Sequence, residues 1–119
     1  MENQFRVIVA GGRDFQNYHL LEEKLNKLLS EKKNVIIVSS LEDGTGRLGH
    51  RYAQNNNLKV DYYPALYQVF GNMAAFERNQ EMAKNADACI CFWNGKSVGT
   101  KDMMDIAKTM NIPLRVISY

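Results

Sequence analysis

Short apolar runs alternate along this chain with longer segments in which apolar residues recur every three or four positions. Five runs are short enough to be strands, and they lie at residues 5–10, 35–38, 58–63, 88–93 and 114–117. The central runs are apolar on both faces, as buried parallel strands are. Helical stripes lie at Leu21, Leu25 and Leu28 and at Met103, Ile106, Ala107 and Met110, with weaker helical patterns over residues 46–57 and 72–85.

The order of these elements predicts an α/β fold. Parallel strands need long crossover connections, and right-handed crossovers place helices on both faces of the sheet. We therefore expect one three-layer, doubly wound domain over residues 1–119, with a mostly parallel five-stranded sheet. A length of 119 residues suits one domain, and we find no internal repeat, low-complexity tract or linker.

The composition is that of an ordinary globular protein, with 45% apolar and 24% charged residues. The net charge is +2, from 15 basic and 13 acidic residues that are scattered rather than gathered in a stripe. We therefore do not expect a nucleic acid as a partner. The first residues are polar and the first apolar run is short, so we expect no signal peptide, no membrane partner and a cytoplasmic location.

Both cysteines, Cys89 and Cys91, lie in one apolar run on the same face of a strand, which favours core packing. A zinc site would need further ligands, but His19 and His50 stand in separate segments without a zinc-like spacing. We therefore predict no structural metal and no cofactor. The two histidines also give no pattern typical of a Ser-His-Asp hydrolase.

Three polar, glycine-bearing loops follow the first, second and fourth predicted strands. Ligands of open parallel sheets gather at the carboxyl ends of the strands, so these loops are expected to converge. The loop of residues 94–100 leads from a strand into a helix, and N–H groups at a helix start attract phosphate or carboxylate. The sequence therefore predicts a pocket for an anionic ligand. The candidate ligand-binding residues are Gly11, Gly12, Arg13, Ser39, Ser40, Gly44, Arg78, Asn79, Asn94, Gly95, Lys96, Ser97, Gly99 and Thr100.

Several of these side chains have two interpretations that the sequence leaves open. Arg13 and Arg78 are either phosphate partners or members of salt bridges. Asn79 either orients a ribose hydroxyl or caps a turn. Thr100 is placed to be a helix N-cap, and Ser97 to do similar work in the turn.

Aromatic residues are frequent in and beside the connection of residues 64–71, which is long enough to cover the site. Tyr62, Tyr63, Tyr67 and Phe70 either stack on a base or pack the connection against the body of the protein. The sequence does not separate these two interpretations.

Several motifs occur in an order that resembles a known family. They are Val7-Ile8-Val9-Ala10-Gly11-Gly12-Arg13-Asp14-Phe15, Glu77-Arg78-Asn79-Gln80-Glu81-Met82 after Gly71, and Phe92-Trp93-Asn94-Gly95-Lys96-Ser97 with Gly99-Thr100-Lys101-Asp102-Met103. Together they resemble the YspA- and YpsA-related branch of the SLOG superfamily over nearly the whole chain. The resemblance implies a Rossmann-like fold, shared with LOG and DprA proteins, that binds nucleotides or nucleotide-derived ligands. It also implies a homo-oligomer, because relatives often pair through helices.

The resemblance leaves catalysis open. LOG-type relatives are phosphoribohydrolases that cleave the bond between base and ribose phosphate, whereas other relatives only bind. Arg78 and Met82 match the first half of the LOG-type motif, but the position of its glutamate holds Met103, and a thioether cannot move protons. If the protein is an enzyme, Arg78 would act with Asp102, which lies one residue away and about 100° around the helix.

The loop of residues 40–46 also departs from the glycine-rich run of relatives, because Asp43 stands for an arginine and Gly46 for an aspartate. The ligand preference of relatives therefore does not transfer directly. We expect non-catalytic binding, or sequestration, of a nucleotide-derived signal or metabolite that is ADP-ribose-like or a cyclic nucleotide. A phage sponge against antiviral signalling is one concrete form. The alternative is a LOG-type nucleotide phosphoribohydrolase, and weak net charge disfavours a DprA-like binder of single-stranded DNA.

Overall fold

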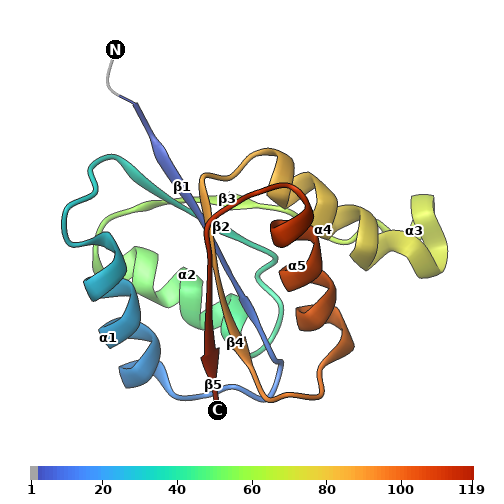
Figure 1. The fold of residues 1–119 in the computed structure, drawn as a ribbon, viewed down its shortest axis with the longest axis horizontal. Helices are drawn as coiled ribbons and strands as arrows, with labels where there is room; N and C mark the ends of the chain where they lie inside the picture. Colours follow the sequence, from blue (N-terminus) through green and yellow to red (C-terminus); the bar gives the residue numbers. More distant parts are fainter. Residues whose placement is uncertain (1–2) are drawn as a thin grey trace.

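The first strand lies at the centre of the sheet, with two strands on each side of it. In the computed structural model, which describes residues 3–119, the strand order is β3-β2-β1-β4-β5 (Figure 1). The strands are β1 (Phe5–Gly11), β2 (Val35–Ser39), β3 (Lys59–Tyr62), β4 (Ala88–Trp93) and β5 (Leu114–Ser118). All strand pairs in this range are parallel, so the predicted α/β fold is confirmed and the sheet is parallel throughout.

The helices form the outer layers, as crossover connections require. They are α1 (Tyr18–Leu29), α2 (Thr45–Asn55), α3 (Tyr67–Phe70), α4 (Ala74–Lys84) and α5 (Val98–Thr109), with a 3₁₀ turn η1 (Gly71–Met73) between α3 and α4. Figure 1 shows α1 and α2 on one side of the sheet and α4 and α5 on the other.

The two faces of the sheet bury different residues because strand side chains alternate. Val7 and Val9 of β1 pack with Leu21 and Leu25 of α1 in one core cluster, which α2 also joins. Ile8 lies between the two valines and packs in a second cluster with residues of α4 and α5. The three layers therefore follow directly from the period of two in the strands.

The two cysteines belong to the second core cluster, as predicted. Cys89 and Cys91 are buried free thiols whose Sγ atoms lie 3.6 Å apart. The hydrogen bond with Cys91 and burial both raise the pKa of Cys89 well above its ordinary value. The thiol therefore stays protonated, which suits a packing role and not that of a nucleophile.

Helix α5 begins earlier than the apolar pattern indicates. Its N-cap is Ser97, whose Oγ accepts a hydrogen bond from the backbone N–H of Thr100 at 3.3 Å. The prediction that Thr100 is the N-cap is therefore wrong, because this residue lies inside the first turn and is buried. The pattern missed the start because Val98 and Gly99 are exposed and do not extend the apolar stripe.

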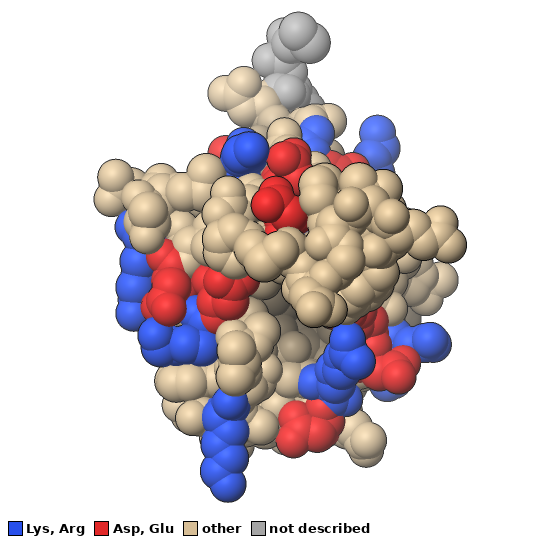
Figure 2. All heavy atoms as spheres, turned by 90° about the vertical axis from the view of Figure 1, so that its right-hand side faces the viewer, with Lys and Arg blue, Asp and Glu red and all other residues tan. Residues whose placement is uncertain are grey.

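The aromatic connection forms α3 and η1 and projects from the body beside α4 (Figure 1). Tyr62 and Tyr67 are each 56% exposed and Phe70 is 44% exposed, whereas Tyr63 packs against the second core cluster. The packing interpretation therefore holds for Tyr63 alone of these four rings. Figure 2 shows an extended uncharged surface on this side of the molecule, with charged groups along its edges.

The loops after β1 and β2 are held together at the carboxyl edge of the sheet. The backbone N–H and the hydroxyl of Thr45 both donate to the carbonyl oxygen of Gly12, at 3.2 and 3.0 Å. Gly44, the N-cap of α2, has a φ of 75°, and a Cβ there would lie 2.4 Å from the carbonyl oxygen of Arg13. Only glycine therefore fits this contact without a backbone shift.

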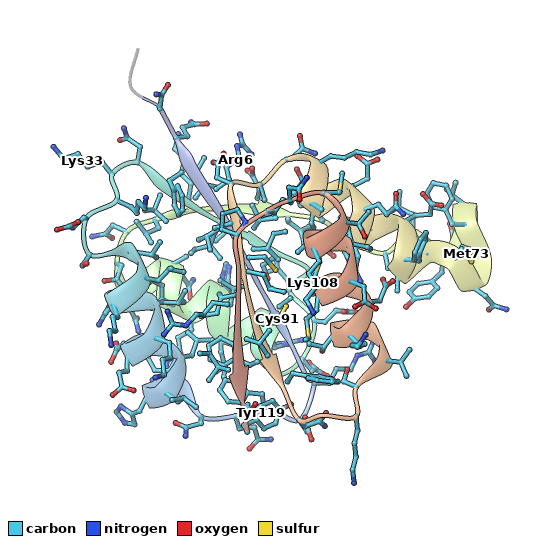
Figure 3. The ribbon with its side chains drawn as sticks, viewed as in Figure 1. Arg6, Lys33, Met73, Cys91, Lys108 and Tyr119 are labelled. Atoms are coloured by element: carbon cyan, nitrogen blue, oxygen red, sulfur yellow. The ribbon has the colours of Figure 1, made fainter. Side chains whose placement is uncertain are left out.

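Tyr119 closes the same edge of the sheet (Figure 3). Its ring packs on Phe15 with centroids 4.7 Å apart, and Phe15 stacks on Phe92 at the same separation. The phenol donates a hydrogen bond to Oδ1 of Asp14. Burial, followed by this bond, raises the pKa of Tyr119 to about 12, and the bond lowers the pKa of Asp14.

Gly44→Ala is expected to destabilise the protein by about 1–3 kcal/mol, because a side chain at this φ is strained and meets fixed backbone. Gly99→Ala is the matched control, since a Cβ there meets nothing within 4 Å and the position is helical. It should leave the free energy of unfolding unchanged or raise it by about 0.5–1 kcal/mol. Urea unfolding measures the free energy of unfolding of both variants. Equal losses of stability in the two variants would contradict the requirement for glycine at position 44.

Asp14→Asn is expected to lower the pKa of Tyr119 only part of the way from about 12 towards 10.0, because burial is the larger cause of the shift. The tyrosinate absorbance, taken as the difference from Tyr119→Phe in each background, measures this pKa. Since the folded pKa lies above the unfolded value, the stabilisation from Tyr119 is complete below about pH 10 and is lost as pH rises towards 12. An unchanged Tyr119 pKa in Asp14→Asn would refute the hydrogen bond.

Candidate ligand-binding site

A cleft of about 420 Å³ opens at the carboxyl ends of β1, β2 and β4, where the sequence predicts a pocket. The loops after β1 and β2 form one wall, and α4 with the first turn of α5 forms the other. The lining residues are Ala10, Gly11, Gly12, Arg13, Asp14, Ser40, Glu42, Asp43, Gly46, Ala75, Arg78, Asn79, Met82, Ser97, Gly99, Thr100 and Met103.

Many of the predicted ligand-binding residues line this cleft. They are Gly11, Gly12, Arg13, Ser40, Arg78, Asn79, Ser97, Gly99 and Thr100. Gly11 packs closely against β4, because a Cβ at this position would lie 2.5 Å from the carbonyl oxygen of Phe92. At Gly99 the space is open instead, so this position leaves room for a ligand.

The other predicted residues lie outside the lining and support the loops. Ser39 is fully buried, and its hydroxyl donates to the carbonyl of Gly46 and accepts from the N–H of Leu41. Oδ1 of Asn94 accepts from the N–H groups of Lys96 and Ser97 at 2.8 and 2.9 Å. Gly44, Gly95 and Lys96 complete this group, and the Lys96 side chain is exposed.

Arg78 lies at the centre of a chain of polar contacts across the cleft. The residue is only 8% exposed. Its Nε donates to Oδ1 of Asn79 at 3.0 Å, and its Nη2 donates to Oε1 of Glu42 at 3.1 Å. Nδ2 of Asn79 in turn donates to Oδ2 of Asp102 at 2.9 Å. The guanidinium thus links the β2 loop with α4 and α5.

One donor in this chain has no acceptor. Among the described residues, the buried side-chain nitrogen and oxygen atoms without a hydrogen-bond partner are Nη1 of Arg78 and Nδ1 of His50. Of these two residues only Arg78 lines the cleft. An unsatisfied buried donor on a charged group is unfavourable, so the hydrogen bonding of the Arg78 guanidinium is incomplete within the protein.

Glu42 accepts from both arginines. Its Oε2 lies 2.9 Å from Nη2 of Arg13, while Oε1 takes the bond from Arg78. The salt-bridge interpretation therefore holds for both Arg13 and Arg78, although Arg13 is largely exposed. Glu42 lies in a loop that the sequence predicts at this edge, but it is not among the predicted ligand-binding residues, because those are glycine, hydroxyl, amide and basic residues.

Three carboxylates line the cleft in all, from Asp14, Glu42 and Asp43. The bond from the Tyr119 phenol holds the pKa of Asp14 below its ordinary value of 3.8, so this carboxylate stays ionised at neutral pH. The position of Asp14 directly after Arg13 in the first loop was the signal that could have identified it.

Arg78 and Asp102, the two residues expected to act together if the protein is an enzyme, do not both line the cleft. Arg78 lines the cleft, whereas Asp102 does not and instead accepts from Asn79. Met103, to which the resemblance assigns the position of the LOG-type glutamate, lines the cleft and is buried in the second core cluster. Both amide atoms of Asn79 are engaged within the protein, which leaves its predicted contact to a ribose hydroxyl untested.

Within residues 3–119, no group of three or more His, Cys, Asp or Glu side chains could hold a metal ion. No helix of the same range combines the length and the hydropathy needed to cross a lipid bilayer. The cytoplasmic location and the pairing of chains stay predictions.

Comparison with known proteins places this geometry in context. "Gene 61 protein" of Mycobacterium phage D29 is 27% identical over 116 residues, which cover 92% of this chain and 93% of that protein. The structure of DNA processing protein A (DprA) from Streptococcus pneumoniae matches 98% of this chain with a TM-score of 0.73 and 18% identity. DNA processing protein A from Helicobacter pylori matches 94% with a TM-score of 0.64 and 16% identity.

These structural matches confirm the Rossmann-like fold and correct one prediction. This chain spans 50% of the first DprA chain and 64% of the second. The Helicobacter pylori protein binds single-stranded DNA, and this similarity contradicts the expectation, drawn from the weak and scattered charge, that a nucleic acid is not a partner. Net charge failed as a criterion because it counts charges without regard to position and ignores base stacking.

The family follows from the first half of the chain. A family model described as "YspA, cpYpsA-related SLOG family" matches residues 5–68, which run from β1 into α3 and make up more than half of the sequence. This segment contains both loops of the first wall of the cleft, with Arg13 and Glu42. The chain belongs to the YspA, cpYpsA-related SLOG family.

Proposed function

We propose that the protein binds a nucleotide-derived small molecule in this cleft and releases it unchanged. The observation that carries the proposal is Nη1 of Arg78, a buried cationic donor without a partner in the lining of the cleft. A phosphate oxygen is the acceptor that a guanidinium binds best. Ser97, Gly99 and Thr100 bring the start of α5 to the same cleft, where the helix dipole favours an anion.

The lining supports binding without turnover. Cleavage of a bond between base and ribose needs a group that transfers a proton at neutral pH. Met103 lines the cleft, at the position that the resemblance assigns to the LOG-type glutamate, and its thioether cannot transfer a proton. Asp14 is ionised because its pKa is lowered, and Glu42 is engaged by two arginines. Retention of the ligand is therefore the simpler function for this set of side chains.

Sequestration is the finer form of this proposal. A protein that captures a signalling nucleotide, of the ADP-ribose or cyclic-nucleotide type, and does not convert it acts as a sponge. The similarity to a phage protein over 92% of the chain is compatible with an anti-defence sponge. Thermal shift with a panel of mononucleotides, cyclic nucleotides and ADP-ribose, followed by chromatography of the recovered small molecules, tests both capture and integrity. Release of free base would overturn the binding function in favour of a phosphoribohydrolase.

Arg78→Lys is expected to weaken the binding of the best ligand of that panel by about 10- to 100-fold, because the shorter ammonium loses a charged hydrogen bond of about 1.5–3 kcal/mol. Isothermal titration calorimetry measures the dissociation constant. Arg78→Lys keeps the net charge, so the loss reports geometry and not long-range attraction.

Arg115→Lys is the matched control, because it makes the same exchange away from the cleft. Arg115 is an exposed residue of β5 outside the lining of the cleft, and this variant also keeps the net charge. We expect at most a twofold change in affinity in this variant. Urea unfolding of Arg78→Lys shows whether the protein remains folded under the binding conditions. Unaltered affinity in a folded Arg78→Lys would exclude Arg78 as the ligand contact.

Single-stranded DNA is a second candidate ligand, favoured by the similarity to the DNA-binding Helicobacter pylori protein and by exposed rings on α3. Stacking of bases on aromatic side chains contributes about 1–3 kcal/mol per base. Tyr67→Ala should therefore weaken the binding of a fluorescent oligothymidylate about tenfold or more in an anisotropy titration at low salt. Val98→Ala, an exposed apolar residue away from α3, is the control. Equal affinities of the two variants would count against α3 as the DNA contact.

A further inference from the structure

Glu42 is paired with both guanidinium groups that line the cleft. Its two carboxylate oxygens take Nη2 of Arg13 and Nη2 of Arg78, at 2.9 and 3.1 Å. Of the two guanidinium groups that line the cleft, Arg78 alone has a buried nitrogen without a partner. The Glu42 carboxylate is thus shared by the two guanidinium groups, and Nη1 of Arg78 remains as a buried donor without an acceptor.

The backbone of Glu42 is fixed at both ends, so the carboxylate stays near the arginines. Its N–H donates to Oγ of Ser40 at 3.2 Å, and its carbonyl accepts from the N–H of Arg47 at 2.9 Å. Leu41, the residue before it, has a φ of 55°, a conformation that non-glycine residues adopt only when their surroundings hold them. The Glu42 side chain is 30% exposed, which leaves it reachable by a ligand.

The charges of the lining favour a ligand with few negative charges. Arg13 and Arg78 contribute two positive charges, and Asp14, Glu42 and Asp43 contribute three negative ones, although Asp43 pairs with Nε of Arg47 at 2.8 Å. A ligand with one phosphate would use Nη1 of Arg78. A pyrophosphate would bring further negative charge towards Asp14 and Glu42, and the exposed cation that could offset it, Arg13, already pairs with Glu42.

We infer that Glu42 is a specificity-determining residue that restricts the cleft to nucleotides with a single phosphate group, as a monoester or a cyclic diester. This inference rests on the proposed binding of a nucleotide-derived ligand. Of the two ligand types expected from the sequence, it selects the cyclic mononucleotide over the ADP-ribose type, which contains a pyrophosphate. The Glu42 carboxylate selects in two ways: it pairs with Arg13, which is then not free for a second phosphate, and it repels that phosphate.

The test is a calorimetric titration of the wild-type protein with AMP, cyclic AMP, ADP and ADP-ribose, repeated with the corresponding guanosine, cytidine and uridine mono-, cyclic mono- and diphosphates. The wild type should bind the one-phosphate forms of its preferred nucleoside at least tenfold more tightly than the diphosphate. Glu42→Gln has nearly the same shape without the charge, and it should shift this ratio at least tenfold in favour of the diphosphate.

Two control variants separate specificity from general effects. Glu42→Asp keeps the charge and should keep the preference for one phosphate. Glu23→Gln removes the same charge from an exposed position of α1 outside the lining and should leave the ratio unchanged. A wild type that binds the diphosphate as tightly as the monophosphate, or a folded Glu42→Gln with an unshifted ratio, overturns the inference while the binding function stands. If none of these nucleotides binds any of the proteins, both proposals fail.

Discussion

The burial of the Arg78 guanidinium is the interaction on which the cleft depends. A charge that is only 8% exposed must be compensated, because moving an ion out of water is unfavourable by several kcal/mol. Glu42 and Asn79 provide this compensation from two different elements, and Asp102 orients the asparagine from a third. Removal of any of these groups would alter the others, so the loop after β2, α4 and α5 act as one unit around the arginine.

The hydrogen bonding of the Arg78 guanidinium is incomplete, because Nη1 has no acceptor. Natural proteins satisfy most buried donors, so a single guanidinium nitrogen without an acceptor stands out against an otherwise bonded network. The same cleft is lined by three carboxylates, from Asp14, Glu42 and Asp43, so the cationic donor lies among acidic side chains. The proposed binding function and the proposed specificity both rest on this arrangement.

The apolar surface of α3 and η1 stands apart from this network. Its two rings, Tyr67 and Phe70, lie outside the lining of the cleft and are both more than 40% exposed, although the segment connects β3 to the helix that carries Arg78. A short helical turn has too little surface of its own to bury large side chains against the sheet. The connection therefore presents aromatic groups to solvent beside the site without closing it.

The sequence by itself determined the layers of the fold and the edge of the sheet at which the cleft forms. Strand periodicity decides which side chains enter each core, and parallel strands bring their following loops together, so β1 with its glycine pair and the segment before α5 could be located from pattern alone. Only the tertiary structure decided that Glu42 pairs with Arg13 and Arg78. It also decided that Asp102 accepts a hydrogen bond from Asn79 and that the Ser39 hydroxyl donates to the backbone of Gly46. These contacts join residues far apart in the chain, and their partners depend on distances and directions that local periodicity does not encode.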